Sequence, residues 1–201
     1  MSGTEMSQEK IDEAIRFHGH WCPGLAIGIR ASELALREIG HAFDEEIVGV
    51  TETDMCAVDA VQFFTGCTFG KGNLIFKDHG KTAFTFYRRA DGKAVRLVFK
   101  PEAAGEPPEE LMAIQKKIYA GEATEEDQEK YKEIRAAWCQ RILDGSLDEI
   151  FEIKPALEPP PKRAQILRSV VCDACGEKFM ESRSRRFMGQ TLCIPCFEAI
   201  E

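Results

Sequence analysis

The sequence lacks two features that would place the protein in a membrane or on nucleic acid. No apolar run approaches the roughly 20 residues of a membrane-spanning helix, and the first residues, MSGTEMSQEKIDEAIRF, are polar where a signal peptide is apolar. Positive charge is scarce as well, because 26 Lys and Arg stand against 34 Asp and Glu, for a net charge of −8. We therefore expect a cytoplasmic protein with no membrane partner. Nucleic acid is an unfavoured partner, although a local basic patch could still bind it.

Cysteine, in contrast, is plentiful. The 201 residues include eight cysteines, within an otherwise ordinary globular composition of 44% hydrophobic and 30% charged residues. This length accommodates one medium domain with a small appendage, or two small domains. Cytoplasmic cysteines stay reduced, so we expect all eight to be thiols available for metal binding or chemistry.

The pattern of apolar residues predicts an α+β core. Helical periodicity indicates helices at 7–18, 23–39, 56–66, 105–121 and 124–145. Strand patterns cover 45–53 and 73–78, and the alternating run 81–100 around Asp91-Gly92 is typical of a β-hairpin. Helices combined with a hairpin region predict a mixed or antiparallel sheet with packed helices.

Three helix starts carry recognisable signals. Ser7 is an expected N-cap. Thr124 is another, with Asp127 three residues on in the manner of a capping box. Pro23 suits the first turn of the second helix, where its missing N–H costs nothing.

A proline-rich stretch divides the chain. Four of the ten residues from Lys154 to Arg163 are proline, and such segments form extended, semi-rigid spacers. The sequence therefore predicts a core at 1–153, a linker at 154–168 and a small C-terminal domain at 169–201.

The C-terminal domain carries two C-x-x-C pairs within 25 residues, formed by Cys172, Cys175, Cys193 and Cys196. Each pair can close a tight knuckle, and two knuckles supply the four thiolates of a tetrahedral structural zinc site. A domain this short needs such a staple to fold. With a hairpin between the pairs and a helix after them, the arrangement resembles a treble-clef zinc finger; the alternatives are separate redox motifs or free thiols.

The finger segment is also basic. From Lys162 to Gln190 there are seven Lys or Arg against three Asp or Glu, a local balance of +4. The run SRRFMGQTLCIPCFE is similar to the zinc fingers of DksA/TraR-type transcription regulators. That resemblance implies a second hypothesis, a metal- or redox-responsive regulator that contacts RNA polymerase or nucleic acid. Two other interpretations of the finger remain. Its basic face could dock on the acidic core, or the finger could mediate dimerisation.

A second group of metal-ligand residue types lies near the N-terminus, in FHGHWCPG. His18, His20 and Cys22 alternate along the chain, so in an extended segment all three would point to one side. Histidine and cysteine together favour zinc or another borderline transition metal. The alternative is a polar corner between two helices, with one histidine capping the first.

The stretch CAVDAVQFFTGCTFGKGN adds further candidates. Cys56 and Asp59 share one helical face, and the helix start near Cys56 is expected to favour a thiolate. Cys67 follows the helix. Ligand hydrogen bonds could come from Gln62, Thr65 and Thr68, and an anion cradle from Lys71 between two glycines, although the G-x-x-x-x-G-K-[ST] spacing is lacking. Cys56 and Cys67 could instead be core residues, which is what we expect of Cys139.

Together, HGHWCPGLAIG and TGCTFGKGN resemble FmdE, a family of formylmethanofuran dehydrogenase subunits, over roughly residues 10 to 150. The resemblance implies an α+β fold, a homodimer, and an active or metal site made by the His/Cys motifs. The site residues that it implies are His18, His20, Cys22, Cys56, Asp59 and Cys67. Among them we expect Cys22, Asp59 and Cys67 to act in catalysis, and His18, His20, Cys22, Cys56 and Cys67 to bind a second transition metal. Gln62, Thr65 and Lys71 are the cofactor-binding candidates that the residues themselves suggest.

The resemblance names no reaction. The family name refers to a molybdenum or tungsten complex that reduces carbon dioxide onto methanofuran, and this chain is too short for its pterin-binding component and lacks a ferredoxin-type cysteine run. We therefore expect a metal-binding accessory protein of molybdenum or one-carbon metabolism, or one component of such an oxidoreductase. We also expect a molybdoenzyme or another protein as a partner, and a small-molecule ligand whose identity the sequence does not give.

Overall fold

The computed structural model describes residues 3–200, which form two compact units divided after Arg163. The division falls within the segment 154–168 that the prolines mark as a linker, and no helix or strand occurs between Lys154 and Ser169.

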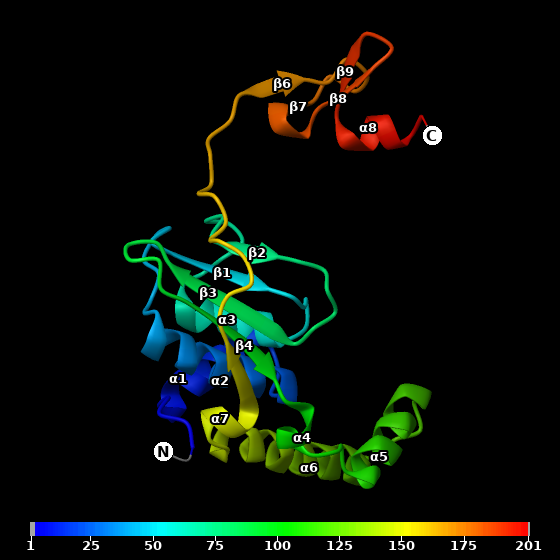
Figure 1. The fold of residues 1–201 in the computed structure, drawn as a ribbon. Helices are drawn as coiled ribbons and strands as arrows, with labels where there is room; N and C mark the ends of the chain where they lie inside the picture. The colour runs from blue at the N-terminus through cyan, green and yellow to red at the C-terminus, as the bar shows by residue number, and fades with distance from the viewer. Residues whose placement is uncertain (1–2, 201) are drawn as a thin grey trace. The chain divides into compact units, whose positions relative to one another are not determined.

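The first unit is built on a five-stranded mixed sheet in the order β2-β1-β3-β4-β5 (Figure 1). Its strands are β1 (Ile47–Thr51), β2 (Leu74–Phe76), β3 (Ala83–Arg88), β4 (Ala94–Phe99) and β5 (Phe151–Lys154). Only β2 runs parallel to its neighbour, β1, whereas the other pairings are antiparallel. The predicted hairpin is β3–β4, with Gly92 in the left-handed conformation (φ 73°) that the turn requires. The α+β prediction is confirmed.

Seven helices of the first unit lie within the described residues. They are α1 (Gln8–His18), α2 (Pro23–Glu38), α3 (Ala57–Thr65), α4 (Pro101–Ala104), α5 (Glu109–Ala120), α6 (Glu125–Asp144) and α7 (Leu147–Ile150). The predicted helix starts are confirmed: Ser7 accepts a hydrogen bond from the Lys10 N–H, Thr124 and Asp127 form a capping box, and Pro23 opens α2. None of these helices, nor any other in the described residues, is long and apolar enough to cross a membrane.

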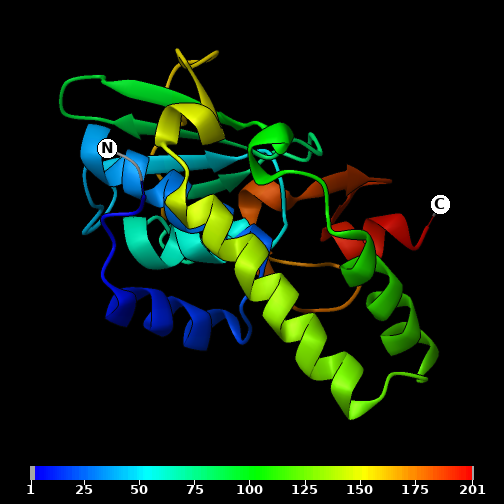
Figure 2. The same cartoon turned by 90° about the horizontal axis from the view of Figure 1, so that it is seen from below.

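Alternating side chains give the sheet two different faces. Phe84, Phe86 and Leu97 point into the main core with α2 and α3, and Figures 1 and 2 show these two helices side by side along the sheet. The opposite face of the sheet carries a smaller hydrophobic cluster around Val48 and Tyr87. Helices α5 and α6 form an antiparallel hairpin (Figure 2), and α6 packs against α2 of the main core.

The crossing of α2 and α3 is close because Gly28 faces the backbone of α3. A Cβ atom at this position would lie 2.3 Å from the carbonyl oxygen of Ala57 and 2.7 Å from its Cα. Since Cys22 begins α2 and Cys56 precedes α3, this contact determines how near the two cysteines lie.

We expect Gly28→Ala to destabilise the core by about 2 kcal/mol. Alanine gains about 1 kcal/mol of helix propensity, but overpacking against backbone that cannot rotate away costs about 3 kcal/mol, the upper end of the usual range. Urea unfolding followed by tryptophan fluorescence measures the difference. Gly70→Ala is the matched control, because nothing lies within 4 Å of its added Cβ; equal midpoints for the two variants would contradict the close crossing.

A buried ion pair ties α2 to the end of α6. Arg30, which is 0% exposed, donates from Nη1 to Oε2 of Glu33 (2.5 Å) and from Nη2 to the carbonyl oxygen of Gly145 (2.6 Å). Glu33 in turn accepts hydrogen bonds from the Thr4 hydroxyl and the Glu5 N–H, both at 2.8 Å. The ion pair therefore links three segments: its carboxylate holds the N-terminal segment to α2, and its guanidinium holds the end of α6 to α2.

The second unit contains two small hairpins and a terminal helix. Its elements are β6 (Ser169–Val171), β7 (Lys178–Met180), the 3-10 turn η1 (Glu181–Arg183), β8 (Arg185–Phe187), β9 (Gln190–Leu192) and α8 (Ile194–Glu198). Met188 and Gly189 between β8 and β9 both have positive φ (48° and 83°), which defines a type I′ hairpin turn.

Candidate metal centres

In the second unit, Cys172 and Cys175 lie on the knuckle between β6 and β7, and Cys193 and Cys196 lie at the start of α8. Their four sulfurs are within 4.8 Å of one another, and those of Cys175 and Cys193 are 3.9 Å apart. Four sulfurs held tetrahedrally at a zinc–sulfur distance of about 2.3 Å lie about 3.8 Å apart. The cysteines therefore have the spacing that a zinc ion requires.

Backbone groups of the knuckle favour the thiolate form. The Cys172 sulfur accepts a hydrogen bond from the Cys193 N–H at 3.4 Å. Backbone N–H groups, that of Cys175 first and that of Cys193 next, lower the pKa of Cys172 to about 6. An ionised sulfur is the form that binds metal, and Cys172 is the ligand biased toward it. The hydrogen bond with Cys193 raises the pKa of Cys196 to about 12, so this thiol needs the charge of a bound cation to ionise.

In the first unit, the structure brings together His18, His20, Cys22 and Cys56. One ligand atom from each of them lies within 4.8 Å of all the others. Three of the four come from the α1–α2 turn, and the fourth directly precedes α3. This set contains two imidazoles and two thiols.

The α1–α2 turn gathers its residues differently from the expected extended segment. His18 is the last residue of α1, and Gly19 ends the helix with φ 93° and donates its N–H to the Ile15 carbonyl. Cys22 is extended and caps α2, since its sulfur accepts the Leu25 N–H at 3.3 Å. A left-handed glycine and a helix cap, rather than strand alternation, therefore converge the three side chains.

Asp59 on α3 orients His18. Its carboxylate lies 2.7 Å from Nδ1 of His18, whose other nitrogen, Nε2, lies 3.8 Å from the sulfur of Cys22. A nitrogen and a sulfur bound tetrahedrally to one zinc ion are about 3.6 Å apart. A carboxylate on the outer nitrogen of a metal-binding histidine is a recurrent arrangement.

The thiolate expected at Cys56 is not what the structure favours. Burial and then the neighbouring Cys22 raise the pKa of Cys56. These two effects outweigh the lowering expected from the dipole of the short helix α3. Burial also lowers the pKa of His20, and the charges of His18 and Arg135 add to this effect. Neutral imidazole is the form that binds metal, while two adjacent thiols need a nearby cation before both can ionise.

Cys67 is not brought to this group. It is fully buried after α3, with its sulfur 3.9 Å from the Ile47 carbonyl oxygen under β1, and burial raises its pKa. A Cβ atom added at Gly49 on β1 would lie 3.4 Å from the Cβ of Cys67. Cys139 is buried in the core as predicted.

The predicted cofactor-binding residues lie apart from the four-residue group. Thr65 is buried and bonds to the Val61 carbonyl, Lys71 donates to the Ala42 carbonyl at 3.5 Å, and Gln62 accepts the Phe69 N–H. Their polar atoms therefore support the chain's own turns. Gln62 also lines a cavity of about 280 Å³ with Asp59.

A larger cleft adjoins the four-residue group at His20 and Cys22. Its volume is about 600 Å³, and its lining includes His20 and Cys22 from the turn and Tyr131, Arg135 and Trp138 from α6. The residues from α6 were not predicted from the sequence. Their spacing of four and three residues, which places an arginine between two aromatic side chains on one helical face, is the signal that could have found them.

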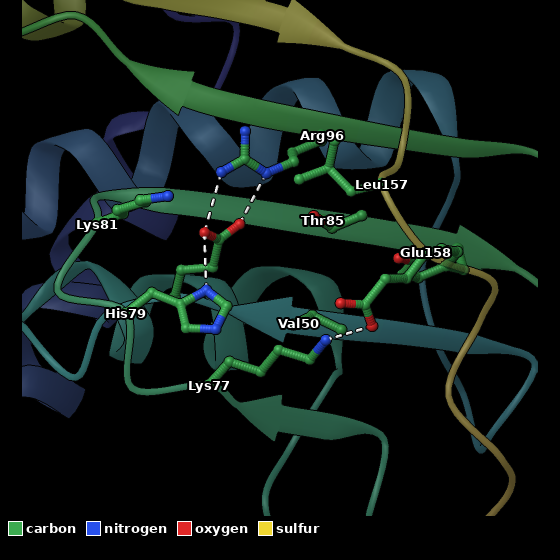
Figure 3. A pocket seen from close by; sticks show the side chains of 10 residues that line it. Val50, Lys77, His79, Lys81, Thr85, Arg96, Leu157 and Glu158 are labelled. Atoms are coloured by element: carbon green, nitrogen blue, oxygen red, sulfur yellow. Dashed lines mark hydrogen bonds and ion pairs between the residues drawn. The ribbon is translucent and has the colours of Figure 1, made fainter.

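The outer face of the sheet carries a separate polar pocket of about 110 Å³ (Figure 3). Arg96 makes a two-pronged ion pair with Glu52 at 2.7 and 3.0 Å, and the same carboxylate lies 3.2 Å from His79. Lys77 pairs with Glu158 at 2.5 Å. Most charges in this pocket are thus satisfied by one another.

Residues 17–152 match the family described as "FmdE, Molybdenum formylmethanofuran dehydrogenase operon", and residues 165–201 match "Prokaryotic dksA/traR C4-type zinc finger". The first match covers more than half of the chain. The chain therefore belongs to the FmdE family and carries a DksA/TraR-type zinc finger, as its sequence motifs predict.

Two individual proteins are similar to this chain. An FmdE-like protein of Syntrophus aciditrophicus, named after tungsten formylmethanofuran dehydrogenase, has a crystal structure that is 25% identical, with a TM-score of 0.64 over 99% of this chain and 97% of that one. A probable S-adenosyl-L-methionine-binding protein of Archaeoglobus fulgidus is 34% identical in an alignment of 191 residues that covers 91% of this chain. The match spans only 51% of that relative, so its name describes a protein about twice as long.

Family membership, the C4 zinc finger and the two clusters support a metal-binding accessory role for this protein. The finger match and its four cysteines point to zinc as the metal of the second unit.

Proposed function

We propose that this protein is a metal-binding accessory protein whose core holds a second transition metal through His18, His20, Cys22 and Cys56. The observation that carries the proposal is the convergence of these four donor atoms within 4.8 Å. Asp59 supports it, because its contact with Nδ1 leaves Nε2 of His18 as the nitrogen near the sulfurs.

Two imidazoles and two thiolates favour zinc or another borderline metal. Zinc held by all four donors would have no open position, so it would supply Lewis acidity only to a ligand oxygen that takes the place of one donor. The chain's own residues would do the rest: Asp59 orients His18, and the Leu25 N–H holds the Cys22 sulfur. His20, which is exposed and lines the 600 Å³ cleft, is the donor that faces incoming molecules.

The family description supports a link to molybdenum enzymes. We propose that the partner is a molybdenum- or tungsten-dependent oxidoreductase of one-carbon metabolism, to which this chain delivers a metal or a small molecule. The C4 finger, as a separate unit, would provide a contact surface for that partner.

Replacing Cys22 by serine is expected to remove the core metal and leave the finger zinc in place. Serine is a good N-cap, so α2 keeps its cap while the soft ligand is lost. Asp59→Asn is expected to weaken core metal affinity about 10- to 100-fold. Elemental analysis of the full chain and titration against a chromophoric chelator measure the two effects.

Cys67→Ala serves as the matched control, since it removes a thiol that the structure places outside the group. It should retain the metal content of the wild type. A wild-type chain whose only metal is lost with Cys193→Ser would refute the core site.

The same distances favour a second function, thiol catalysis. Cys22, His18 and Asp59 line up as thiol, imidazole and carboxylate, with contacts of 3.8 and 2.7 Å. In this order histidine can accept the thiol proton while aspartate holds the ring, as in cysteine-based acyl transfer.

Iodoacetamide distinguishes the two functions. In its reaction the Cys22 sulfur forms a bond to carbon and iodide leaves. If the relay activates Cys22, then in metal-free protein His18→Ala should slow this alkylation at least about 100-fold, measured by peptide mass spectrometry. An unchanged rate would leave the metal site as the function of the group.

A further inference from the structure

The largest feature beside the core group is the cleft of about 600 Å³ between the α1–α2 turn and the α5–α6 hairpin. This volume lies in the range of small-molecule sites. His20, Cys22 and Pro23 form one side, and residues of α5 and α6 form the other. Any molecule in the cleft would therefore contact two of the proposed metal ligands.

The helical side of the cleft is rich in rings. Tyr119 of α5 and Tyr131 and Trp138 of α6 line it, together with Leu111 and Met112. Trp138 is fixed by a hydrogen bond from its indole N–H to the Ala104 carbonyl oxygen at 2.7 Å. Aromatic walls of this kind accept planar apolar groups, with ring contacts worth more than their buried area alone.

Arg135 is the cation of the cleft. Its side chain is half-buried, and its guanidinium lies 5.7 Å from the centre of the Tyr131 ring. Throughout residues 3–200, no carboxylate pairs with Arg135 and no side-chain hydrogen bond engages it. In a chain of net charge −8, an arginine left free at a cleft wall is a ready partner for an external anion.

We propose that the cleft binds a small aromatic anion, with its acidic group on Arg135, its ring against Tyr131 and Trp138, and its far end at His20 and Cys22. This inference rests on the proposed function and names the ligand class of the same site. A carboxylate and a phosphate would both satisfy the guanidinium, since each offers it two oxygens.

A pair of fluorescent probes tests the charge and the ring separately. 1-Anilinonaphthalene-8-sulfonate carries an anion, whereas N-phenyl-1-naphthylamine has the same ring system without it. We expect Arg135→Gln to raise the Kd of the anionic probe at least about tenfold, because a lost hydrogen bond between charged groups is worth more than a factor of ten. The Kd of the neutral probe should stay within about twofold.

Arg141→Gln is the matched control on the same helix, with the same change in charge. Equal weakening of the anionic probe by both variants would overturn the proposal, as would equal weakening of the neutral probe by Arg135→Gln. In the wild type, naphthalene-1-carboxylate and 1-naphthyl phosphate then compete with the anionic probe. The stronger competitor identifies the acidic group, and failure of both would also count against the cleft.

Metal analysis separates this inference from the proposed function. Arg135→Gln should keep the full metal content, while Cys22→Ser loses the core metal. A chain with core metal and no Arg135-dependent probe binding would refute the ligand inference alone. A chain without core metal whose probe binding still depends on Arg135 would refute the metal site and leave an anion cleft.

Discussion

Removal of zinc is expected to unfold residues 169–200 while the core unit stays folded. Only Cys172, Leu192 and Cys193 are buried in the hydrophobic cluster of the finger, and two of the three are ligand residues. Such a cluster cannot offset the conformational entropy of ordering the unit. Structural zinc in small fingers contributes on the order of 10–16 kcal/mol, so its loss should be decisive.

Hydrogen exchange of the full chain, read by mass spectrometry, provides the measurement. After chelation, protection should vanish in β6 through α8 and persist in α2, α3 and the sheet. Cys193→Ser should reproduce the effect without chelator, and Cys67→Ala should not. Slow exchange across the finger in metal-free protein would show that packing alone holds it.

Replacement of Glu33 by alanine is expected to lower the free energy of unfolding of the core by about 3–5 kcal/mol. The change leaves the guanidinium of Arg30 buried without its carboxylate, and the N-terminal segment loses its two hydrogen bonds to Glu33. A charge without a partner in a low-dielectric interior is far more costly than a missing surface pair.

Urea unfolding followed by tryptophan fluorescence reports this effect, since Trp21 and Trp138 both lie in the core unit. Glu38→Ala is the control: its partners Lys93 and Arg37 are at the surface, and we expect a loss of no more than about 1 kcal/mol. The double replacement of Arg30 by methionine and Glu33 by leucine should recover much of the loss. Similar costs for Glu33→Ala and Glu38→Ala would contradict the buried pair.

Signals that act over a few residues were readable from the sequence. Ser7, Thr124 and the Asp91-Gly92 turn each determine a local structure through groups three or four positions away. Strand β5 escaped prediction because it is a strand only by virtue of pairing with β4, which lies about fifty residues earlier. The short helix α7, in contrast, carries a local signal that could have found it, the capping box of Ser146 and Glu149.

The same distinction applies to the candidate site. The residue types and the paired C-x-x-C spacing indicated both clusters, because the identity of metal-binding side chains and their spacing along the chain are visible in the sequence. That Cys56 rather than Cys67 joins His18 and Cys22 depends on the approach of Gly28 to Ala57, which is a tertiary contact. The spacing of Tyr131, Arg135 and Trp138 marks them as one face of α6, but the meeting of that face with the α1–α2 turn is a tertiary contact that exists only in the folded core.

The division of the core group between an early turn and a later helix has a consequence for the newborn chain. Cys56 follows Cys22 by 34 residues, which at typical rates of synthesis is about 2 to 7 s. During that interval His18, His20 and Cys22 are exposed to cellular metal without their fourth partner or the orienting Asp59. Ions captured then would be held weakly and exchange freely, and selection among metals would begin only when α3 docks on α2.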